Sequence, residues 1–483
     1  MSKTHKTIFG TTEKSNFILN MTNDQFNKTA SVMFTIGFSL IFVLSAVSEI
    51  ISNMMVSETT YDWKIIPSIS LGITGILGAV VFIIALIKQT LTKKQIIGSL
   101  TALALTVFMY ISYVNSISTV QDYSGFLGFR HGRYEGLLVH LSYIFIFLGS
   151  MSMNSEKAVN TVFKVFSAIM ILESIWSALQ FIPSFPGFYY KIPYLMVNPM
   201  LPSGTAGSPV FLAVMLSAGL IISAFGAMHD KSSVFSVIYK LAVLPVSFFL
   251  VKTQTLAGYI SSAVILAAVL TDYIRSKKSE KTDSTPLILM ISGFAAALVF
   301  ILIKGFAVYD GEVIWQDGCT RLGAFGQYSA SLEGSFDIHD ITEVYPFLWN
   351  KAAEIIKQFP VTGIGPDAFV FSQRSGIFND VPLSVDRPYN EYLFYAASFG
   401  IPAAVSLAAL FFYSSANGVM SALRKKSWIF SASMTAAVLF TLSALFTSGT
   451  ATVSPFPHYS RSAKSALPIK LYHKVQQKST VFQ

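Results

Sequence analysis

The stretch that decides the fold reads IIPSISLGITGILGAVVFIIALI and occupies residues 65–87. It contains no charged residue and is long enough to cross a bilayer as a helix, which takes about 20 residues. The whole chain has the same character. Hydrophobic residues make up 53% of its 483 residues, charged residues only 12%, and the mean hydropathy is +0.57. Soluble domains carry about 25% charged residues, so this composition predicts a membrane protein.

Further apolar runs of similar length lie along the chain. They predict an all-α polytopic membrane protein with about eleven to twelve transmembrane helices. The first 28 residues are mostly polar and lack the apolar core of a signal peptide, so we expect no cleaved leader. The predicted spans are residues 30–54, 65–87, 96–117, 136–153, 161–182, 208–228, 233–251, 255–274, 285–305, 391–415 and 427–447.

Every second connection between these spans is basic, which places those connections in the cytoplasm by the positive-inside rule. The N-terminus is then cytoplasmic, and the long polar segment 306–390 lies outside the membrane. A loop of this length is more often functional than connective. The residues that define the pattern are Lys3, Lys6, Lys14, Lys28, Lys88, Lys93, Lys94, Lys157, Lys231, Arg275, Lys277, Lys278, Lys281, Arg424, Lys425 and Lys426.

These predictions divide the chain into five segments. They are a cytoplasmic N-terminal segment (1–29), helices one to nine (30–305), the long extracytoplasmic loop (306–390), helices ten and eleven (391–447) and a C-terminal tail (448–483). The tail is basic, although an outward tail should not be. A twelfth span lost by a frameshift or a truncation would explain it.

The net charge of +9, from 34 basic and 25 acidic residues, arises mainly in the cytoplasmic connections. These connections suit anionic lipid, so the charge predicts no nucleic-acid partner. The single cysteine, Cys319, excludes an intrachain disulfide and a thiolate metal cluster. A small buried side chain is the simplest interpretation of this residue.

Charged residues gather in the outward connection 122–136, just before the fourth predicted span. Arg130, His131, Arg133 and Glu135 lie within six positions of one another. Guanidinium groups bind phosphate oxygens in pairs, so the segment is a candidate anion pocket. Long basic side chains that reach from the membrane to the interface explain the same pattern, and the sequence leaves both interpretations open.

The next outward connection, residues 183–208, is rich in proline, glycine and aromatic residues. Pro209 is suited to the first position of the sixth span. Backbone N–H groups at such a helix start attract anions, but ordinary capping of the helix accounts for the same residues.

Residues 346–359 in the long loop predict an amphipathic helix. Trp349, Ala353, Ile356 and Phe359 are spaced for one face, and charged residues occupy the others. Such a helix either lies at the membrane interface or closes a water-filled cavity. The glycines of the following segment 363–366 break it sharply.

Several short motifs occur in order between about residue 120 and residue 415. They comprise Gly132, Arg133, Glu135 and Gly136; Gly204, Thr205, Gly207 and Pro209; TQTLAGY at 253–259; Trp349, Phe359, Pro360, Gly363, Gly365, Pro366 and Phe369; and Asp386, Arg387, Asn390, Glu391, Tyr392 and Leu393, followed by Gly400, Ile401 and Pro402. In this order they resemble the O-antigen ligase and polymerase superfamily of membrane glycosyltransferases.

The resemblance implies a GT-C-like helical fold and transfer of a glycan from a polyprenyl-diphosphate donor to an acceptor glycan or lipid hydroxyl, without a metal or other cofactor. Family members act at the outer face of the bacterial inner membrane. Their arginines hold the diphosphate, because fixed guanidinium groups neutralise the leaving group. A histidine in the long loop takes the acceptor proton.

The chain departs from this pattern at three positions, because Leu256 and Tyr345 stand where the family has arginine and Tyr389 stands where it has histidine. Neighbouring residues are candidates to replace them. His339 and Arg387 are the predicted catalytic residues, with Arg374 a further phosphate candidate. The predicted substrate-binding residues are Arg133, Glu135, Arg321, Asn390 and Glu391.

Two other functions are consistent with the sequence. A polysaccharide transporter or flippase would need ionisable residues at mid-span, for which Lys240 and Glu173 are the candidates. A non-catalytic family member would explain the loss of the three charged or titratable positions.

Overall fold

The computed structural model describes residues 17–54, 65–116, 123–129, 134–181, 202, 204–206, 209–230, 236–277, 283–304, 308–309, 312–313, 341–369, 388, 390–425 and 428–443. Its helices are α1 (Phe17–Asn20), α2 (Asn23–Met54), α3 (Ile65–Ile87), α4 (Lys93–Val114), α5 (Leu137–Met151), α6 (Glu156–Leu179), α7 (Pro209–His229), α8 (Val237–Lys252), α9 (Leu256–Lys277), α10 (Thr285–Lys304), α12 (Ile341–Gln358), α13 (Glu391–Phe399), α14 (Ile401–Lys425) and α15 (Trp428–Ser443), with a short 3-10 helix η2 (Gly204–Ala206). Two small antiparallel hairpins pair β1 (Tyr123–Ser124) with β2 (Gly128–Phe129) and β3 (Val308–Tyr309) with β4 (Glu312–Val313).

The protein is a polytopic helical membrane protein. Each predicted span falls on a described helix, and the tenth is divided at Gly400 into α13 and α14. Within the described residues, seven helices are long and apolar enough to cross a membrane: α2, α3, α4, α6, α7, α9 and α10. α5 and the first part of α14 are shorter apolar helices. The total of eleven to twelve spans stays a prediction.

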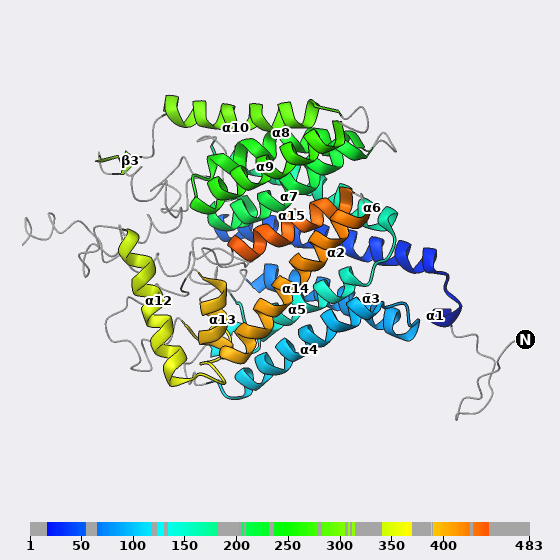
Figure 1. The fold of residues 1–483 in the computed structure, drawn as a ribbon. Coiled ribbons are helices and arrows are strands. Elements are labelled where there is room, and N and C mark those ends of the chain that lie inside the picture. Colours follow the sequence, from blue (N-terminus) through cyan, green and yellow to red (C-terminus); the bar gives the residue numbers. More distant parts are fainter. Residues whose placement is uncertain are drawn as a thin grey trace, which may run out of the picture.

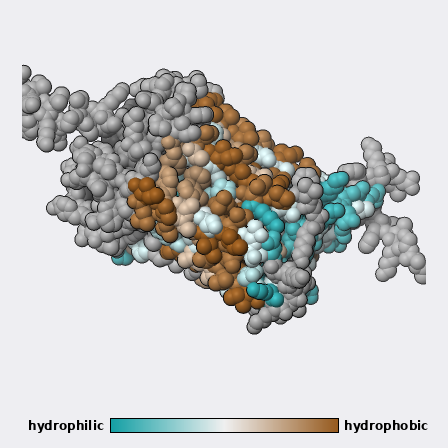
Figure 2. Space-filling view, turned by 90° about the horizontal axis from the view of Figure 1, so that it is seen from above, coloured by the Kyte–Doolittle hydropathy of each residue, from teal (hydrophilic) through white to brown (hydrophobic). Residues whose placement is uncertain are grey.

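The outer surface of the bundle is apolar, as a bilayer requires. On α3 and α4 the large exposed side chains recur every three or four residues, so each helix turns one apolar face outward. On α10, Leu302 and Ile303 are 74% and 75% exposed. Figure 2 shows this apolar belt, in brown, beside hydrophilic residues in teal. A soluble protein would not expose so much contiguous apolar surface.

Close packing of α3 and α5 depends on glycine. Gly75 lies against Ser142, and a Cβ atom at Gly149 would lie 2.4 Å from the carbonyl oxygen of Gly78. On the other side of α3, Thr74 donates to the carbonyl of Gly37 on α2 at 3.1 Å. In a membrane, small residues let helix backbones approach closely, and van der Waals contact then holds the helices together.

Figure 1 shows that most helices run side by side, while α12 crosses them at the end of the bundle opposite the N-terminus. One buried core is formed by α6, α7, α8, α9, α10 and α15, and a second by α4, α5, α13 and α14. We call the end that contains Asn27 and Asn154 the basic end, and the end that contains Ser116 and Gly204 the loop end. The basic end is the predicted cytoplasmic side.

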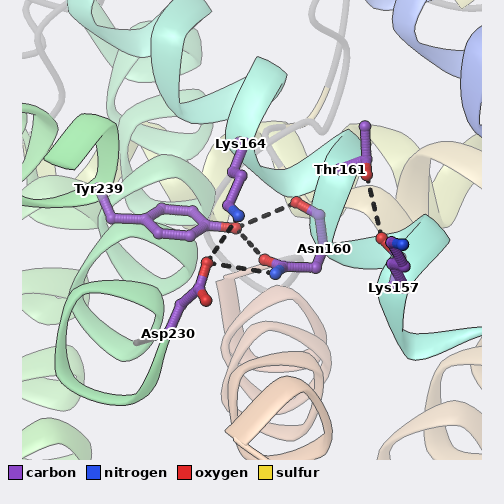
Figure 3. A network of polar contacts seen from close by, with 6 residues as sticks. All are labelled: Lys157, Asn160, Thr161, Lys164, Asp230 and Tyr239. Carbon is purple, nitrogen blue, oxygen red and sulfur yellow. Dashed lines mark hydrogen bonds and ion pairs between the residues drawn. The ribbon is translucent and has the colours of Figure 1, made fainter. Parts of the chain in front are cut away.

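Polar side chains tie α6, α7 and α8 together at the basic end (Figure 3). Asp230 is bound by the ammonium of Lys164 at 2.8 Å and by the side-chain amide of Asn160 at 3.2 Å. The hydroxyl of Tyr239 donates to the side-chain oxygen of Asn160 at 2.6 Å. Since the side chain of Asp230 is only 3% exposed, these contacts supply the partners that a buried carboxylate needs.

Two further charged pairs lie at the basic end. His229 of α7 contacts Asp272 of α9 at 2.6 Å, and Lys240 of α8 contacts Asp283, just before α10, also at 2.6 Å. Helices α6 to α10 are therefore cross-linked by polar contacts at this end.

Candidate functional site

The segment from Pro360 to Phe369 is a tight turn bound to the backbone of α13. The N–H groups of Ile364 and Gly365 donate to the carbonyls of Ala397 and Ser398, at 3.0 and 2.9 Å. The N–H of Ile401 donates back to the carbonyl of Pro360 at 2.8 Å. These bonds fix this part of the long loop against the end of α13 and the start of α14.

The glycines of this turn are required by the close approach of two backbones. Gly363 and Gly365 have φ angles of +63° and +112°, which favour glycine. A Cβ atom at Gly363 would lie 2.4 Å from the carbonyl carbon of Ser398, so no larger residue fits. The predicted break after the loop helix is confirmed, because α12 ends at Gln358.

Helix α12 confirms the predicted amphipathic helix, and its most buried residues lie one position before the residues of the predicted apolar face. Leu348, Ala352 and Ile355 are the fully buried residues, with exposures of 2%, 0% and 0%. Trp349 is half-buried, and its indole N–H donates to the carbonyl of Pro388 at 3.1 Å. Each step along a helix rotates about 100°, so the buried residues and the half-buried Trp349 lie on neighbouring parts of the helix surface. Sequence periodicity predicts a broad apolar face of the helix. Which residues of that face are most buried depends on the segments that pack against it.

Glu135 is fully buried at the loop end, where the β1–β2 hairpin covers the start of α5. Its backbone N–H donates to a carboxylate oxygen of Asp367 in the tight turn, at 3.4 Å. The hairpin carbonyls of Gly125 and Phe126 accept from the N–H groups of Leu137 and Leu138. This helix start is thus capped by backbone. The predicted role of Glu135 in substrate binding stays a prediction.

Asn390 begins α13 as its N-cap. Its side-chain oxygen accepts from the N–H of Leu393 at 3.0 Å, and the adjacent Glu391 is 7% exposed. Capping occupies the Asn390 oxygen, so a role of this residue in substrate binding stays a prediction. Glu391, in the first turn, suits the positive end of the helix dipole.

A buried carboxylate of α6 holds the segment that precedes α7. Glu173 accepts from the backbone N–H of Thr205 at 2.6 Å and from its hydroxyl at 2.9 Å. Gln180 forms two more bonds with the backbone of Gly204. We call these four residues the Glu173 clasp. It accounts for the Gly204–Thr205 motif as structural capping rather than anion binding.

The connection between α8 and α9 places three polar residues in the interior. Lys252, Thr253 and Gln254 all have 0% exposure. The ammonium of Lys252 lies 4.7 Å from the ring centre of Phe300 and 5.6 Å from that of Phe181. Sequence reasoning missed Lys252, which it treated only as a break between two spans. A lysine so close to the predicted interface is ordinarily expected to reach water.

A second missed residue is His140 of α5. Its Nδ1 lies 2.9 Å from the hydroxyl of Tyr395, and aromatic rings of α13 surround the imidazole. Only 1% of the residue is exposed, and among the described residues nothing hydrogen-bonds its Nε2 atom. No local pattern signals this pair, because 255 positions separate its members.

The remaining predicted site residues lie outside the described part of the chain: Arg133, Arg321, His339, Arg374, Arg387 and Tyr389, together with Cys319, Arg130 and His131. The backbones of Leu256 and Tyr345 are in α9 and α12, but their side chains are outside the description. Convergence of the predicted arginines therefore stays a prediction.

Residues 241–408 match the family model described as O-antigen ligase. Over these residues the chain is similar to the O-antigen ligase family. The match begins within α8 and ends within α14, so it includes the α8–α9 connection, α12, the tight turn and α13. It confirms the resemblance to the O-antigen ligase and polymerase superfamily. No curated protein matches the chain.

Proposed function

We propose that the protein is a membrane glycosyltransferase of the O-antigen ligase type. It transfers a glycan from a polyprenyl-diphosphate donor to the hydroxyl of a glycan or lipid acceptor at the loop end. The observation that carries this proposal is the O-antigen ligase match over α8 to α14, in a polytopic helical protein. The resemblance to O-antigen ligases places the protein in the bacterial inner membrane in this proposal. Its N-terminus lies in the cytoplasm, because the basic connections are expected on the cytoplasmic side.

The reaction needs two groups from the chain. A cation must stabilise the diphosphate as it leaves the anomeric carbon, and a base must take the acceptor proton as the new bond forms. His339 is the proposed base, and Arg133, Arg321 and Arg387 are proposed to bind the diphosphate, with Glu135, Asn390 and Glu391 near the sugar. Tyr389 is a poor base near neutral pH, because the pKa of a tyrosine is ordinarily about 10.

Transport is the runner-up, and two observations count against it. Glu173 bonds to Thr205 at the loop end, and Lys240 pairs with Asp283 at the basic end, so neither is an ionisable residue at mid-span. A transporter also has to open at both ends. Here ion pairs and hydrogen bonds tie the helices together at the basic end (Figure 3).

The test measures glycan transfer from an undecaprenyl-diphosphate-linked donor in membranes that contain wild-type, Arg387→Ala, His339→Ala or Arg275→Ala protein. We expect the first two variants to lose at least about tenfold activity, because each removes a group that acts in the transition state. Arg275 is an exposed residue at the basic end, so its variant is the matched control. Absence of product with wild-type protein would support the non-catalytic alternative.

A further inference from the structure

We propose that His140 is a positioning residue, whose hydrogen bond to Tyr395 fixes α13 against α5. The bond thereby sets the separation between Glu135 and the start of α13, where Asn390 and Glu391 lie. This role rests on the proposed function, in which these three residues lie near the sugar. His140 does not touch the substrate; it acts through Tyr395.

The pair joins the two segments that carry these predicted substrate residues. His140 is in the first turns of α5, five positions after Glu135. Tyr395 is in α13, five positions after Asn390 and four after Glu391. The imidazole Nδ1 and the Tyr395 hydroxyl are 2.9 Å apart. Because a helix is stiff over one or two turns, a bond between these side chains also fixes the starts of the two helices relative to each other.

Helix α13 needs such a constraint, because it is short and follows a different line from α14. It contains nine residues and is separated from α14 by Gly400, with a φ angle of +87°. At its carboxyl end, the hydroxyl of Ser112 on α4 donates to the carbonyl of Ser398 at 2.7 Å, beside the bonds from the tight turn. The pair of His140 and Tyr395 adds a directional contact nearer the middle of the helix.

The rest of the contact between α5 and α13 is apolar. The rings of Phe399 and Tyr395 meet the imidazole edge-on, with centroids 4.8 and 5.3 Å away, and that of Phe394 lies at 6.1 Å. Apolar contact has no preferred direction, so aromatic rings alone allow several rotations of a short helix. A hydrogen bond requires a defined distance and angle, so it selects one of them.

The choice of histidine at this place costs stability. The residue is 1% exposed, and its Nε2 atom has no hydrogen-bond partner among the described residues. Phenylalanine would fill a similar volume and leave no polar atom unpaired, which is the cheaper solution in an apolar core. A polar pair in such a core specifies one arrangement of the helices at a cost in stability. We therefore assign the pair to positioning rather than to stabilisation.

The experiment compares wild-type protein with the double variant His140→Phe and Tyr395→Phe in glycan transfer from an undecaprenyl-diphosphate-linked donor. The change removes both polar partners and keeps two rings. We expect kcat to fall by about ten- to a hundredfold, because a displacement of about 1 Å misaligns the reacting groups. The melting temperature should equal or exceed that of the wild type, since no buried polar atom of the pair is left unpaired. A purely structural pair would lower the melting temperature and leave kcat per folded molecule unchanged.

Hydrogen–deuterium exchange in lipid nanodiscs reports on α13 without any reaction. Residues 391–396 should exchange up to about tenfold faster in the double variant, the equivalent of one lost hydrogen bond. The single variants keep the test sharp if the double variant fails to fold. Tyr395→Phe removes only the hydroxyl and should slow transfer. His140→Gln can still bond to that hydroxyl, so it should retain more of the kcat than His140→Phe.

The matched control is the double variant Ser167→Ala and Ser223→Ala. These serines also form a buried hydrogen bond between two helices, α6 and α7, at 2.9 Å, and both are 0% exposed. No predicted substrate residue lies beside them in sequence. Their removal should leave both kcat and the exchange of α13 unchanged.

Slower transfer together with faster exchange of α13 supports the proposal. Wild-type transfer and wild-type exchange in the double Phe variant overturn it. Slower transfer with unchanged exchange also overturns it, because His140 would then act on the substrate directly. Faster exchange of α13 in a protein whose wild type transfers no glycan upholds the bond as the constraint on α13 and refutes the proposed reaction. Faster exchange with an unchanged kcat refutes the positioning role and leaves the proposed reaction intact.

Discussion

Removal of the Glu173 carboxyl group should destabilise the protein by more than any exposed substitution on the same helix. Glu173 is fully buried on α6 and accepts two hydrogen bonds from Thr205, at 2.6 and 2.9 Å. These bonds anchor the segment that leads into α7. Glu173→Leu leaves a backbone N–H and a hydroxyl without this acceptor, whereas Glu173→Gln keeps one acceptor oxygen and offers the hydroxyl an amide donor.

The expected size of each effect follows from these bonds. A hydrogen bond to a charged group contributes about 1.5–3 kcal/mol, but bonds between membrane helices average nearer 0.6 kcal/mol. Relief from burying the charge offsets part of the loss. We therefore expect Glu173→Leu to lower the free energy of unfolding by about 2–4 kcal/mol, Thr205→Val by about 1–2 kcal/mol and Glu173→Gln by about 1 kcal/mol.

Unfolding of the purified protein in detergent, followed by tryptophan fluorescence, measures these changes. Glu156→Gln is the control, because Glu156 is exposed in the first turn of the same helix and should change stability by less than about 0.5 kcal/mol. The double variant of Glu173→Leu and Thr205→Val should be less destabilised than the sum of the two, since both remove the same hydroxyl bond. The reasoning is refuted if Glu173→Leu is as stable as the control, or if the two changes add fully.

Three further predictions concern other parts of the bundle. Gly149→Ala should cost about 1–3 kcal/mol of stability, measured by the same unfolding assay, because its Cβ would lie 2.4 Å from a backbone oxygen of α3; unchanged stability would contradict this. The hydrogen bond from Lys240 lowers the pKa of Asp283 to about 2, so the pair should stabilise the protein by at most about 1 kcal/mol above pH 4 and lose that contribution as pH falls through 2. The melting temperatures of wild-type and Asp283→Asn protein should then converge on acidification. A difference in melting temperature that does not change with pH would contradict this contribution of the Lys240–Asp283 pair. Trp349→Phe removes the hydrogen bond from the indole N–H to the carbonyl of Pro388, so a protease should cleave the long loop faster. An unchanged rate of digestion would contradict this prediction.

The fold could be predicted further than the site. Apolar runs gave every described membrane helix, because a chain in a bilayer must satisfy its backbone within each span. The tenth span was predicted as one continuous helix, but the structure divides it into α13 and α14 at Gly400, which has a φ angle of +87°. Its cause is distant in sequence, since a Cβ atom there would lie 2.1 Å from the carbonyl oxygen of Val361.

The candidate site depended on contacts that no local pattern records. Asn390 was predicted from its motif to bind substrate. The structure shows its side-chain oxygen as the N-cap of α13, and the substrate role stays a prediction. Glu173 was a candidate mid-span residue for the transporter alternative, and the structure shows it bonded to Thr205 at the loop end. Lys252 received no role at all. Motifs indicate which positions matter in a family, but one motif can serve packing in one place and chemistry in another.

The sequence by itself determined that this chain spans a membrane as helices, which of its ends are basic and which family its motifs resemble. Composition and periodicity suffice for that, because hydrophobic transfer and backbone hydrogen bonding act on each segment separately. Only the tertiary structure decided which polar side chains are buried and what each one touches. It placed Glu173 against Thr205, His140 against Tyr395 and Lys252 beneath two aromatic rings. Those outcomes depend on how helices distant in sequence pack together, and packing is a property of pairs of surfaces rather than of any one segment.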